Sequence, residues 1–549
     1  MISSIAAGLA LFTTVNAVLD SRGLPLDPTG VKTLVTPQNI TIRYKEPGKE
    51  GVCETTPGVN SYSGYIDLDA NSHTFFWFFE ARKDPGNAPF TVWLNGGPGS
   101  DSLIGAFQEI GPCFVTQNLT TELNPYSWNE NSNMLFLSQP VGTGFSYASE
   151  GVGKLSRFSG AFEETSPEEA EGRYPVINAT EIDTTALAAV AAWHILQGFV
   201  GGLNTLDPKV NLTSKKEFNL WAESYGGHWG PAFYRYFYDR NEEIANGTIQ
   251  GTQLEFNSLG IVNGMVDAYS QFPFFPEFAV NNTYGIKGMN DTLYEFAKFA
   301  LNMWGGCLAQ IDSCRLTNFT STIDHSICSY AAAICRGTVE APFELYSEFG
   351  YYDIRQPWNV TDPPDYFVDY LNLDSVRNAI GVNLNYSASN SEIYYAFQLT
   401  GDFIYPTFLK DVEYLLDNDV AVSFVYGDAD YICNWMGGEA ASLAANYTHS
   451  AEFAAAGYAP FMVDGKEYGA VRQHGKFSFV RIYDAGHKVP YYQRKASLEL
   501  FNRVSRNLDV AEGKTKVTSD YSTVGPSKST HRNTSPPPQR LAARTAPLA

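Results

Sequence analysis

Residues 218–228 read Phe-Asn-Leu-Trp-Ala-Glu-Ser-Tyr-Gly-Gly-His, and the serine in this stretch is residue 224. An apolar run that stops abruptly at a serine and continues with small residues is typical of a buried strand that turns sharply into a helix. Such a turn lifts the serine hydroxyl above the edge of a sheet, where it can react. The stretch therefore predicts a strand-to-helix turn with Ser224 exposed at its tip.

Two later stretches repeat this pattern with other polar residues. The apolar run at 421–426 leads into Gly-Asp-Ala-Asp430, and the run at 477–483 leads into Asp-Ala-Gly-His487. Three strand-like runs thus end at a serine, an acid and a histidine, which is the chain order of nucleophile, acid and base in α/β-hydrolases. We therefore expect an α/β-hydrolase fold, with a central, mostly parallel sheet flanked by helices, and the chemistry of a serine hydrolase.

The base and the acid are not equally well defined by the sequence. Of the eight histidines, His487 alone follows a strand-like run at a glycine turn, whereas His228 lies one helical turn past Ser224 and should point away from its hydroxyl. Asp428 and Asp430 both follow the run at 421–426. Spacing alone favours Asp430 only slightly.

Serine attack on a carbonyl also needs hydrogen-bond donors for the developing oxyanion. In this fold one donor is the amide after the nucleophile, here that of Tyr225, and the other comes from a glycine-rich turn after an early strand. Residues 93–99, Trp-Leu-Asn-Gly-Gly-Pro-Gly, supply such a turn. A phosphate-binding loop is the competing interpretation, but no Gly-Lys-Ser/Thr follows. A purely structural turn would also explain the glycines.

Length and composition restrict the class of protein. The 549 residues, 44% of them apolar, suit one large α/β enzyme with insertions. A net charge of −22 would repel nucleic acids and anionic membranes, so neither is an expected partner. Residues 1–17 resemble a signal peptide, and no other stretch reads as long and apolar enough to span a membrane. Together with twelve Asn-x-Ser/Thr sequons, this start predicts a secreted glycoprotein.

Seven cysteines suit an oxidising compartment with one thiol left over. Four of them have six-residue gaps on both sides of a central gap, a symmetry that favours nested bridges, with Cys307–Cys335 around Cys314–Cys328. A zinc site is the alternative, but the gaps are wider than those of zinc knuckles. Cys53 and Cys113 would then pair across the N-terminal sheet, and Cys433 would remain as the free thiol.

The chain divides by composition into a signal peptide and five further segments. We predict an N-terminal segment at 18–50, a first core part at 51–264, an inserted cap at 265–365, a second core part at 366–511 and a disordered tail at 512–549, which is rich in Lys, Ser, Thr and Pro. Within the first core part we expect a hairpin at 62–79, strands at 90–94, 134–137 and 259–262, a helix at 184–200 and an exposed loop at 148–182.

Five motifs identify a family resemblance. They are residues 93–99, Gln-Pro-Val-Gly-Thr-Gly-Phe-Ser-Tyr at 139–147, Glu-Ser-Tyr-Gly-Gly-His at 223–228, Gly-Asp-Ala-Asp-Tyr-Ile-Cys-Asn-Trp at 427–435 and Ala-Gly-His-Lys-Val-Pro at 485–490. Over about residues 40–505 the chain resembles the serine carboxypeptidases of the secreted fungal, carboxypeptidase Y-like type. The resemblance implies that Ser224 is the nucleophile, His487 the base and Asp430, rather than Asp428, the acid. It also implies an oxyanion hole made by the amides of Gly97 and Tyr225.

The same resemblance implies how a free peptide C-terminus is recognised. Asn95, Glu109 and Glu223 match the residues that hold the substrate's α-carboxylate in this family, with Trp93 beside them. Two close carboxyl groups cannot both ionise cheaply, so one should keep a proton and donate a hydrogen bond to the substrate. The expected function is therefore removal of C-terminal amino acids from peptides and proteins, favoured at acidic pH, without metal or cofactor.

Departures from the family pattern leave some points open. The run Ser100-Asp101-Ser102 stands where a cysteine is usual, so a family disulfide is absent and a charge lies near the glycine-rich turn. Lys488 follows the catalytic histidine, where its cation could change the preference for the leaving residue. An acyltransferase or esterase with the same triad is the main alternative function. A non-catalytic binding protein of the same fold is a second one, although no triad residue is missing.

Overall fold

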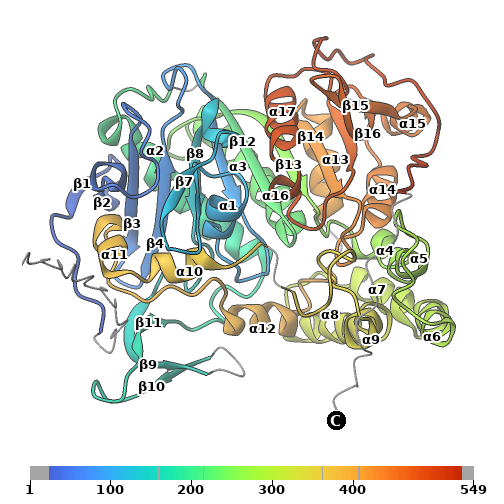
Figure 1. Ribbon diagram of the computed structural model, residues 1–549, viewed down its shortest axis with the longest axis horizontal. Helices are drawn as coiled ribbons and strands as arrows, with labels where there is room; N and C mark the ends of the chain where they lie inside the picture. The colour runs from blue at the N-terminus through green and yellow to red at the C-terminus, as the bar shows by residue number, and fades with distance from the viewer. Residues whose placement is uncertain (1–23, 157–160, 214, 361–362, 406–407, 534–549) are drawn as a thin grey trace, which may run out of the picture.

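The computed structural model describes residues 24–156, 161–213, 215–360, 363–405 and 408–533 (Figure 1). The predicted signal peptide at 1–17 and the end of the chain after residue 533 lie outside the described residues. Within those residues twelve strands form one sheet in the order β1-β2-β3-β4-β8-β5-β12-β13-β14-β17-β16-β15. These strands are β1 (Lys32–Val35), β2 (Thr41–Lys45), β3 (Ser61–Asp69), β4 (Ser72–Phe79), β5 (Phe90–Leu94), β8 (Asn133–Leu137), β12 (Glu217–Glu223), β13 (Glu255–Val262), β14 (Ala421–Gly427), β15 (Ala459–Val463), β16 (Lys466–His474) and β17 (Phe477–Ile482).

The middle of the sheet is parallel. From β8 through β5, β12, β13 and β14 to β17, every neighbouring pair runs in the same direction, whereas the pairs on either flank are antiparallel. The carboxyl ends of β5, β12, β14 and β17 therefore meet at one edge of the sheet, where open α/β sheets bind ligands. This arrangement brings together the four sequence motifs that follow those strands.

Both faces of the parallel strands are buried, which explains their continuous apolar runs. Along β12, Leu220 and Ala222 face one hydrophobic cluster and Trp221 faces the other. The first cluster is covered by α2 (Thr185–Leu206), α3 (Gly226–Ala245) and α13 (Phe408–Asp417). The second is covered by α1 (Leu103–Gln108), α10 (Tyr366–Leu371), α11 (Asp374–Ile380) and α17 (Arg494–Ser505). The expected hairpin, strands and helix of the first core part are all present.

Helix α2 corrects one expectation. Among the described residues it is the one helix long and apolar enough to cross a membrane by length and composition, whereas the sequence was interpreted as having no such stretch after its start. Most of α2 is buried, however, because it packs against α3 and the sheet. Its apolar composition is that of a core helix.

The segment predicted as the cap, residues 265–365, is mainly helical up to Tyr346. It contains α4 (Ala268–Gln271), α5 (Phe274–Val280), α6 (Asp291–Asn302), α7 (Cys307–Arg315), α8 (Thr322–Cys335), a π-helical turn (Arg336–Glu340) and α9 (Ala341–Tyr346). In Figure 1 these helices gather beside the ends of β13 and β14. The predicted disulfides Cys307–Cys335 and Cys314–Cys328 both join α7 to α8 and are confirmed.

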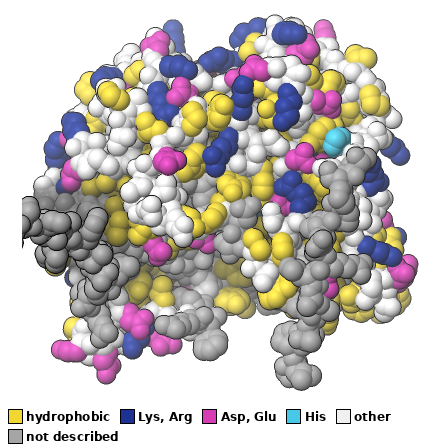
Figure 2. Space-filling model, in the orientation of Figure 1, with side chains coloured by type: hydrophobic (Ala, Val, Ile, Leu, Met, Phe, Trp, Pro, Cys, Tyr) yellow, Lys and Arg dark blue, Asp and Glu magenta, His cyan; other side chains and the backbone are white. Residues whose placement is uncertain are grey.

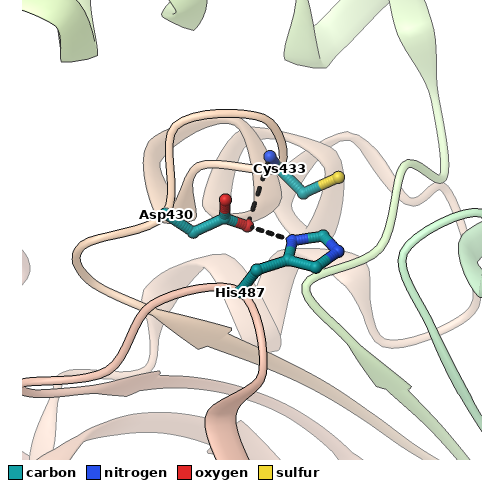
Figure 3. A group of neighbouring side chains, drawn as sticks. All are labelled: Asp430, Cys433 and His487. Atoms are coloured by element: carbon teal, nitrogen blue, oxygen red, sulfur yellow. Dashed lines mark hydrogen bonds and ion pairs between the residues drawn. The ribbon is translucent and has the colours of Figure 1, made fainter. Parts of the chain in front are cut away.

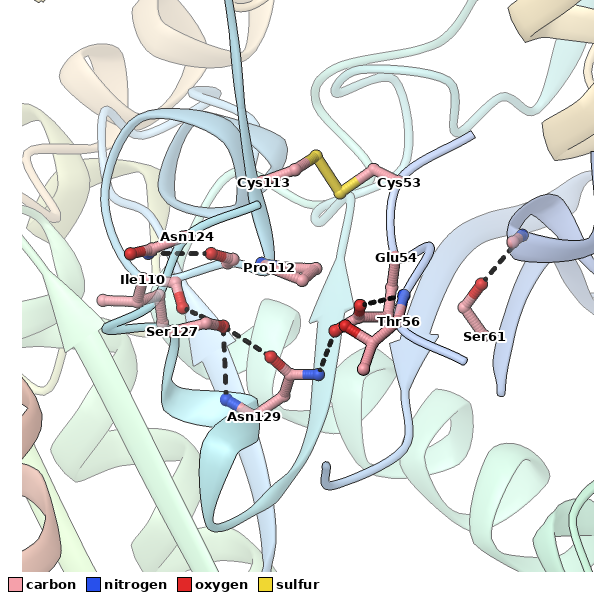
Figure 4. Close-up of a disulfide and its surroundings, with 12 residues drawn as sticks. Cys53, Glu54, Thr56, Ser61, Ile110, Pro112, Cys113, Asn124, Ser127 and Asn129 are labelled. Atoms are coloured by element: carbon pink, nitrogen blue, oxygen red, sulfur yellow. Dashed lines mark hydrogen bonds between the residues drawn. A yellow bond between two sulfur atoms is a disulfide. The ribbon is translucent and has the colours of Figure 1, made fainter. Parts of the chain in front are cut away.

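The remaining cysteine predictions are also confirmed. Cys53 bonds to Cys113, and Cys433 is a buried free thiol. Around the Cys53–Cys113 bridge, Asn129 donates from Nδ2 to Glu54 Oε2 at 2.8 Å (Figure 4). The bridge ties the chain before β3 to the first residue of β6 (Cys113–Val115), and the hydrogen bond ties it to the turn that follows β7 (Thr121–Leu123).

Residues 148–182 are not the plain loop that was expected. Their described part contains three antiparallel strands, β9 (Ser149–Leu155), β10 (Phe162–Glu164) and β11 (Gly172–Val176), which project at the lower left of Figure 1. Gly151 allows the Phe162 ring to approach the neighbouring strand, since a Cβ there would lie 2.7 Å from that ring. The glycines that suggested a loop therefore permit close pairing.

The predicted disordered tail is also wrong for residues 512–533, which we call the C-terminal segment. Thr523 donates its N–H to the Gln473 carbonyl in β16, and the buried Arg481 of β17 donates to the carbonyls of Ser529 and His531. The Lys- and Ser-rich composition predicted disorder, but the backbone carbonyls of this segment supply the acceptors that a buried guanidinium requires.

The chain contains further short helices and a mixed surface. These helices are α12 (Ser391–Thr400), α14 (Trp435–Ala444), α15 (Ser450–Ala455) and α16 (Val489–Tyr492). On the face shown in Figure 2, basic side chains are interspersed with acidic ones and form no continuous basic surface.

Candidate active site

Ser224 occupies the sharp turn between β12 and α3. Its φ of 64° lies in the left-handed region, which costs a non-glycine residue about 1–3 kcal/mol unless its surroundings hold it there. Three backbone hydrogen bonds do so. The Ser224 N–H donates to Val262, and the Ser224 carbonyl accepts from Gly227 and Met265 at 2.9 and 3.1 Å. The serine is therefore held at the tip of a strained turn, as predicted.

His487 and Asp430 form the second part of the site (Figure 3). His487 Nδ1 lies 2.8 Å from Asp430 Oδ2, which also accepts from Asn263 Nδ2 at 2.7 Å and from the Cys433 N–H at 3.3 Å. Burial raises the pKa of Asp430, and the bonds from His487 and Asn263 oppose that rise. The arrangement fixes the His487 ring through Nδ1 and leaves Nε2 for proton transfer.

The competing acid, Asp428, does not contact the histidine. It accepts hydrogen bonds from Tyr284 Oη at 2.5 Å and from the Asp484 N–H at 3.0 Å, and it lies 3.5 Å from Arg481. His228 is likewise turned away from the site, since its ring nitrogens face the carbonyls of Met265 and Phe403. Geometry thus separates Asp430 from Asp428, where spacing hardly could.

The glycine-rich turn after β5 packs directly on the serine turn. A Cβ on Gly96 would lie 2.3 Å from the Tyr225 nitrogen, and Gly97 has a φ of +103° that favours glycine. Among the described residues, the N–H groups of Gly97 and Tyr225 donate to no protein acceptor. Both amides are therefore available to an oxyanion.

Beyond the serine, buried polar side chains form a chain that starts at Trp93. Trp93 Nε1 donates to Asn95 Oδ1 at 2.7 Å, and Asn95 Nδ2 donates to Glu223 Oε1 at 3.1 Å. Burial raises the pKa of Glu109, and burial together with the charge of Glu109 raises the pKa of Glu223 well above its usual range. One of the two carboxyl groups therefore keeps a proton at a pH where a free glutamate would lose it.

Asn95 and Glu223 open into one pocket of about 420 Å³, which Ser224, Gly97 and His487 also line. The pocket thus brings together the predicted nucleophile, base and oxyanion turn with two of the four predicted carboxylate-binding residues. Glu109 and Trp93 are not among its lining residues. Further lining residues come from the stretch 350–360 and from Asp365 and Phe367, and the aromatic ones are Tyr351, Tyr352, Trp358 and Phe367.

Lys488 points into the same pocket. Its Nζ donates to Gln108 Oε1 at 2.5 Å, and Gln108 Nε2 donates to Asp365 Oδ1 at 3.0 Å. The Lys488 ammonium lowers the pKa of both Glu109 and Glu223, which partly offsets the effect of their burial. The substituted residue after the histidine therefore acts on the carboxyl pair.

The other departure, Asp101, is buried. Burial raises its pKa to about 6, and the nearby hydroxyls of Ser138 and Tyr386 oppose that rise. Its N–H donates to the Ala388 carbonyl at 2.9 Å, and Ser100 pairs with Ser389 in a β-bridge. Backbone pairing therefore holds the chain after the glycine-rich turn.

Two residues of the site were not identified from the sequence. Asn263 has a detectable signal, because it is a polar residue at the carboxyl end of β13, between the strands that bear Ser224 and Asp430. The backbone carbonyl of Tyr352 accepts a hydrogen bond from the backbone N–H of His487 at 2.8 Å, and the centroids of the two rings lie 4.9 Å apart. It lies in the predicted cap, and nothing local in the sequence connects it to the histidine.

Asp430, Cys433 and His487 also lie close enough to hold a metal ion, with one ligand atom each within 4.8 Å of the others. Their chemistry argues against that role. His487 Nδ1 and Asp430 Oδ2 already bind each other, and burial raises the pKa of Cys433 well above its usual value, which disfavours the thiolate that metals require.

The parallel sheet, with serine, acid and histidine following β12, β14 and β17, defines an α/β-hydrolase. A crystal structure of Kex1(delta)p, a prohormone-processing carboxypeptidase from Saccharomyces cerevisiae, shares this fold, with a TM-score of 0.63 and 18% identity over 88% of this chain and 99% of that one.

The chain belongs to the serine carboxypeptidase family, whose model matches residues 47–507. It is 39% identical to carboxypeptidase S1 homolog B of Arthroderma otae, over 97% of this chain and 87% of the relative. It is 35% identical to carboxypeptidase S1 of Penicillium janthinellum, over 83% of this chain and 97% of the relative. The expected resemblance is confirmed, and the protein is a hydrolase of the serine carboxypeptidase type.

Proposed function

We propose that this serine carboxypeptidase cleaves the last peptide bond of its substrates with Ser224, His487 and Asp430 as its triad. The observation that carries the proposal is the bond of His487 Nδ1 to Asp430, in a protein whose Ser224 and His487 line one pocket. Ser224 attacks the carbonyl carbon, and His487 takes the hydroxyl proton on Nε2. The oxyanion accepts hydrogen bonds from the amides of Gly97 and Tyr225.

Collapse of this intermediate breaks the C–N bond. His487 gives its proton to the departing amino acid, and the acyl group stays on Ser224. Water then attacks the acyl-enzyme, with His487 as base, and releases the shortened peptide. Asp430 stabilises the imidazolium in both half-reactions without taking its proton.

Recognition of the free C-terminus is assigned to the carboxyl pair. Asn95 and whichever of Glu109 and Glu223 holds the proton donate hydrogen bonds to the substrate's α-carboxylate. Because both glutamates have raised pKa values, the proton is present in acid and is lost as the pH rises above their raised values. Loss of the proton leaves two anions facing a third, so peptide binding should weaken with rising pH.

The test compares a blocked dipeptide with its C-terminal amide, from about pH 4 to 8. Wild type should release the C-terminal amino acid from the free acid, and KM for that substrate should rise with pH. Glu223→Gln removes one titrating charge and should flatten the rise. Ser224→Ala should abolish turnover of both substrates. Equal KM values for acid and amide at every pH would contradict the carboxylate role.

We further propose that the protein works outside the cell or in a vacuole-like compartment. Three disulfides occur among the described residues, and such bonds persist mainly in oxidising compartments. Fractionation of the producing cells, together with a shift in mobility after deglycosylation, would test this assignment. Protein found only in the cytosol without glycans would contradict it.

A further inference from the structure

The side chain of Tyr225, whose amide faces the oxyanion, lies inside the protein. Its ring is only 2% exposed and stacks on His228, with centroids 4.2 Å apart. Its hydroxyl donates to Asp402 Oδ2. A tyrosine at this position thus connects the oxyanion amide to a buried acid that the mechanism above does not use.

Asp402 is itself fixed from several directions. Its Oδ2 accepts from Thr185 Oγ1 at 2.5 Å, and its Oδ1 accepts from the Thr185 N–H at 2.9 Å, at the first residue of α2. Aspartate at a helix N-terminus is favoured by both the free N–H groups and the helix dipole. The carboxyl group therefore has a rigid support in the longest helix of the core.

The backbone around Asp402 is held by the predicted cap. Gly401 has a φ of 79°, and a Cβ there would lie 2.2 Å from the backbone of Cys328 in α8. Cys328 is bonded to Cys314, so the approach is made to a part of α8 that a disulfide holds. Contacts thus run from the cap through Gly401 and Asp402 to the Tyr225 ring.

These contacts bear on the strained turn at Ser224 and Tyr225. Ser224 needs external support to keep its left-handed conformation, and its backbone bonds to Val262, Gly227 and Met265 hold the nucleophile. The peptide plane between Ser224 and Tyr225 also carries the oxyanion N–H. The direction of this N–H depends on the position of the Tyr225 Cα. The hydrogen bond from the Tyr225 hydroxyl to Asp402 helps to fix that position.

We propose that Asp402 is a positioning residue for the oxyanion hole, which it aligns through the hydroxyl of Tyr225. The proposal rests on the function proposed above. Asp402 does not touch the substrate. It keeps the Tyr225 N–H aimed at the oxyanion, an interaction that counts mainly in the transition state and so supports kcat more than substrate binding.

The experiment is Tyr225→Phe, which removes the hydroxyl and keeps the ring. Loss of a whole oxyanion donor costs about 10²–10³-fold in kcat, so a misdirected one should cost about 10-fold, with KM unchanged within about twofold. Thr185→Val and Asp402→Asn disturb the other side of the contact and should give smaller losses of the same kind. Tyr225→Phe combined with Asp402→Asn should lose less than the product of the single losses, since both break one interaction.

Tyr234→Phe is the matched control. Tyr234 is a buried tyrosine of α3, the helix that begins directly after Tyr225. Its hydroxyl donates to the Phe218 carbonyl at 3.0 Å, at the end of β12 away from Ser224. Its variant should lower the melting temperature and keep kcat. If Tyr225→Phe lowers only the melting temperature, as this control does, the hydroxyl is structural and the proposal is wrong.

All variants are assayed on a simple ester as well as on the blocked dipeptide. Both reactions pass through the oxyanion, so kcat should fall for both. An enzyme that cleaves the ester but not the peptide would refute the carboxypeptidase assignment and would still test Asp402. If Tyr225→Phe does not fold, Thr185→Val decides, and an unchanged kcat in a folded Thr185→Val would overturn the proposal.

Discussion

Two buried acidic sites serve the same pocket and are built in opposite ways. At Asp430, one carboxylate oxygen accepts three hydrogen bonds, and those from His487 and Asn263 oppose the effect of burial on its pKa. At Glu223, the negative charge of Glu109 adds to the effect of burial. Among the described residues, both Glu109 oxygens and Glu223 Oε2 lack a hydrogen-bond partner.

The contrast separates two tasks for a carboxyl group. Asp430 accepts three hydrogen bonds on Oδ2, although its Oδ1 has no partner among the described residues, and it serves as a fixed anion for His487. The glutamate pair keeps a proton and leaves bonding capacity unused, which suits the arrival of an outside carboxylate. The expected consequences below run from the largest effect to the smallest.

Asp430→Asn should be the most damaging change at either site. An amide in place of the carboxylate favours the wrong tautomer of His487, so kcat should fall by about 10⁴-fold with little change in KM. Asp428→Asn is the matched control, because Asp428 follows the same strand and is equally buried but bonds Tyr284. It should lower the melting temperature and spare kcat. Similar losses of kcat in both variants would remove the distinction between the two acids.

Replacing Glu109 and Glu223 together by alanine should act on binding. Without the pair, the substrate carboxylate loses hydrogen bonds that involve a charge, so KM for free-acid peptides should rise about 100-fold. KM for a C-terminally amidated ester should stay within about threefold. Steady-state kinetics on both substrates measure this, and retained ester cleavage shows an intact triad. A parallel rise in both KM values would mean that the pair only maintains the pocket's shape.

Asn263→Ala probes how strongly the hydrogen bonds to Asp430 Oδ2 matter. The change removes one of its three donors, and a hydrogen bond to a charged group is worth enough to predict a loss of about 10-fold in kcat. Asn219→Ala is the control, since Asn219 is a buried asparagine that bonds Thr91 and Ser258 near the start of β12. If the two variants have the same kcat, the contact of Asn263 with the acid has no catalytic value.

Lys488→Met should shift the acidic behaviour of the glutamate pair. The ammonium lowers both pKa values, so its removal should raise them and let the proton persist to higher pH. The pH at which KM for peptides begins to rise should move up by about half a unit to one unit. Lys495→Met, which removes a lysine paired with Asp464 at the surface, should leave that pH unchanged. A shift downward would reverse the assigned sign.

The sequence predicted best what depends on local chain geometry. The strand runs, the turn at Ser224 and the glycine at position 96 each follow from a backbone requirement that few residues meet. Asp430 and Asp428 could not be separated by the same reasoning, because two residues of spacing do not say which side chain faces the histidine. The contacts of Asn263 and Tyr352 arise only when separate segments meet.

The errors share a cause as well. Residues 148–182 and 512–533 have the composition of loops and tails, yet the described part of the first forms a small antiparallel sheet and the second bonds to other parts of the chain. Composition describes what a segment can do alone. Composition does not show that the buried Arg481 of β17 needs the carbonyls of Ser529 and His531 as acceptors.

The packing of the C-terminal segment bears on whether one copy of the enzyme can digest another. A carboxypeptidase shortens a chain whose end can enter the pocket, and a neighbouring copy offers the same pocket to this chain. To be trimmed past Asn533, the segment must first release Arg481, the His531 ring must leave Tyr483, 3.7 Å away, and Asn533 must leave Asp484. Each release requires local unfolding, so self-digestion should stall at this point. The bonds of Arg481 to this segment should therefore limit self-digestion at the C-terminal side.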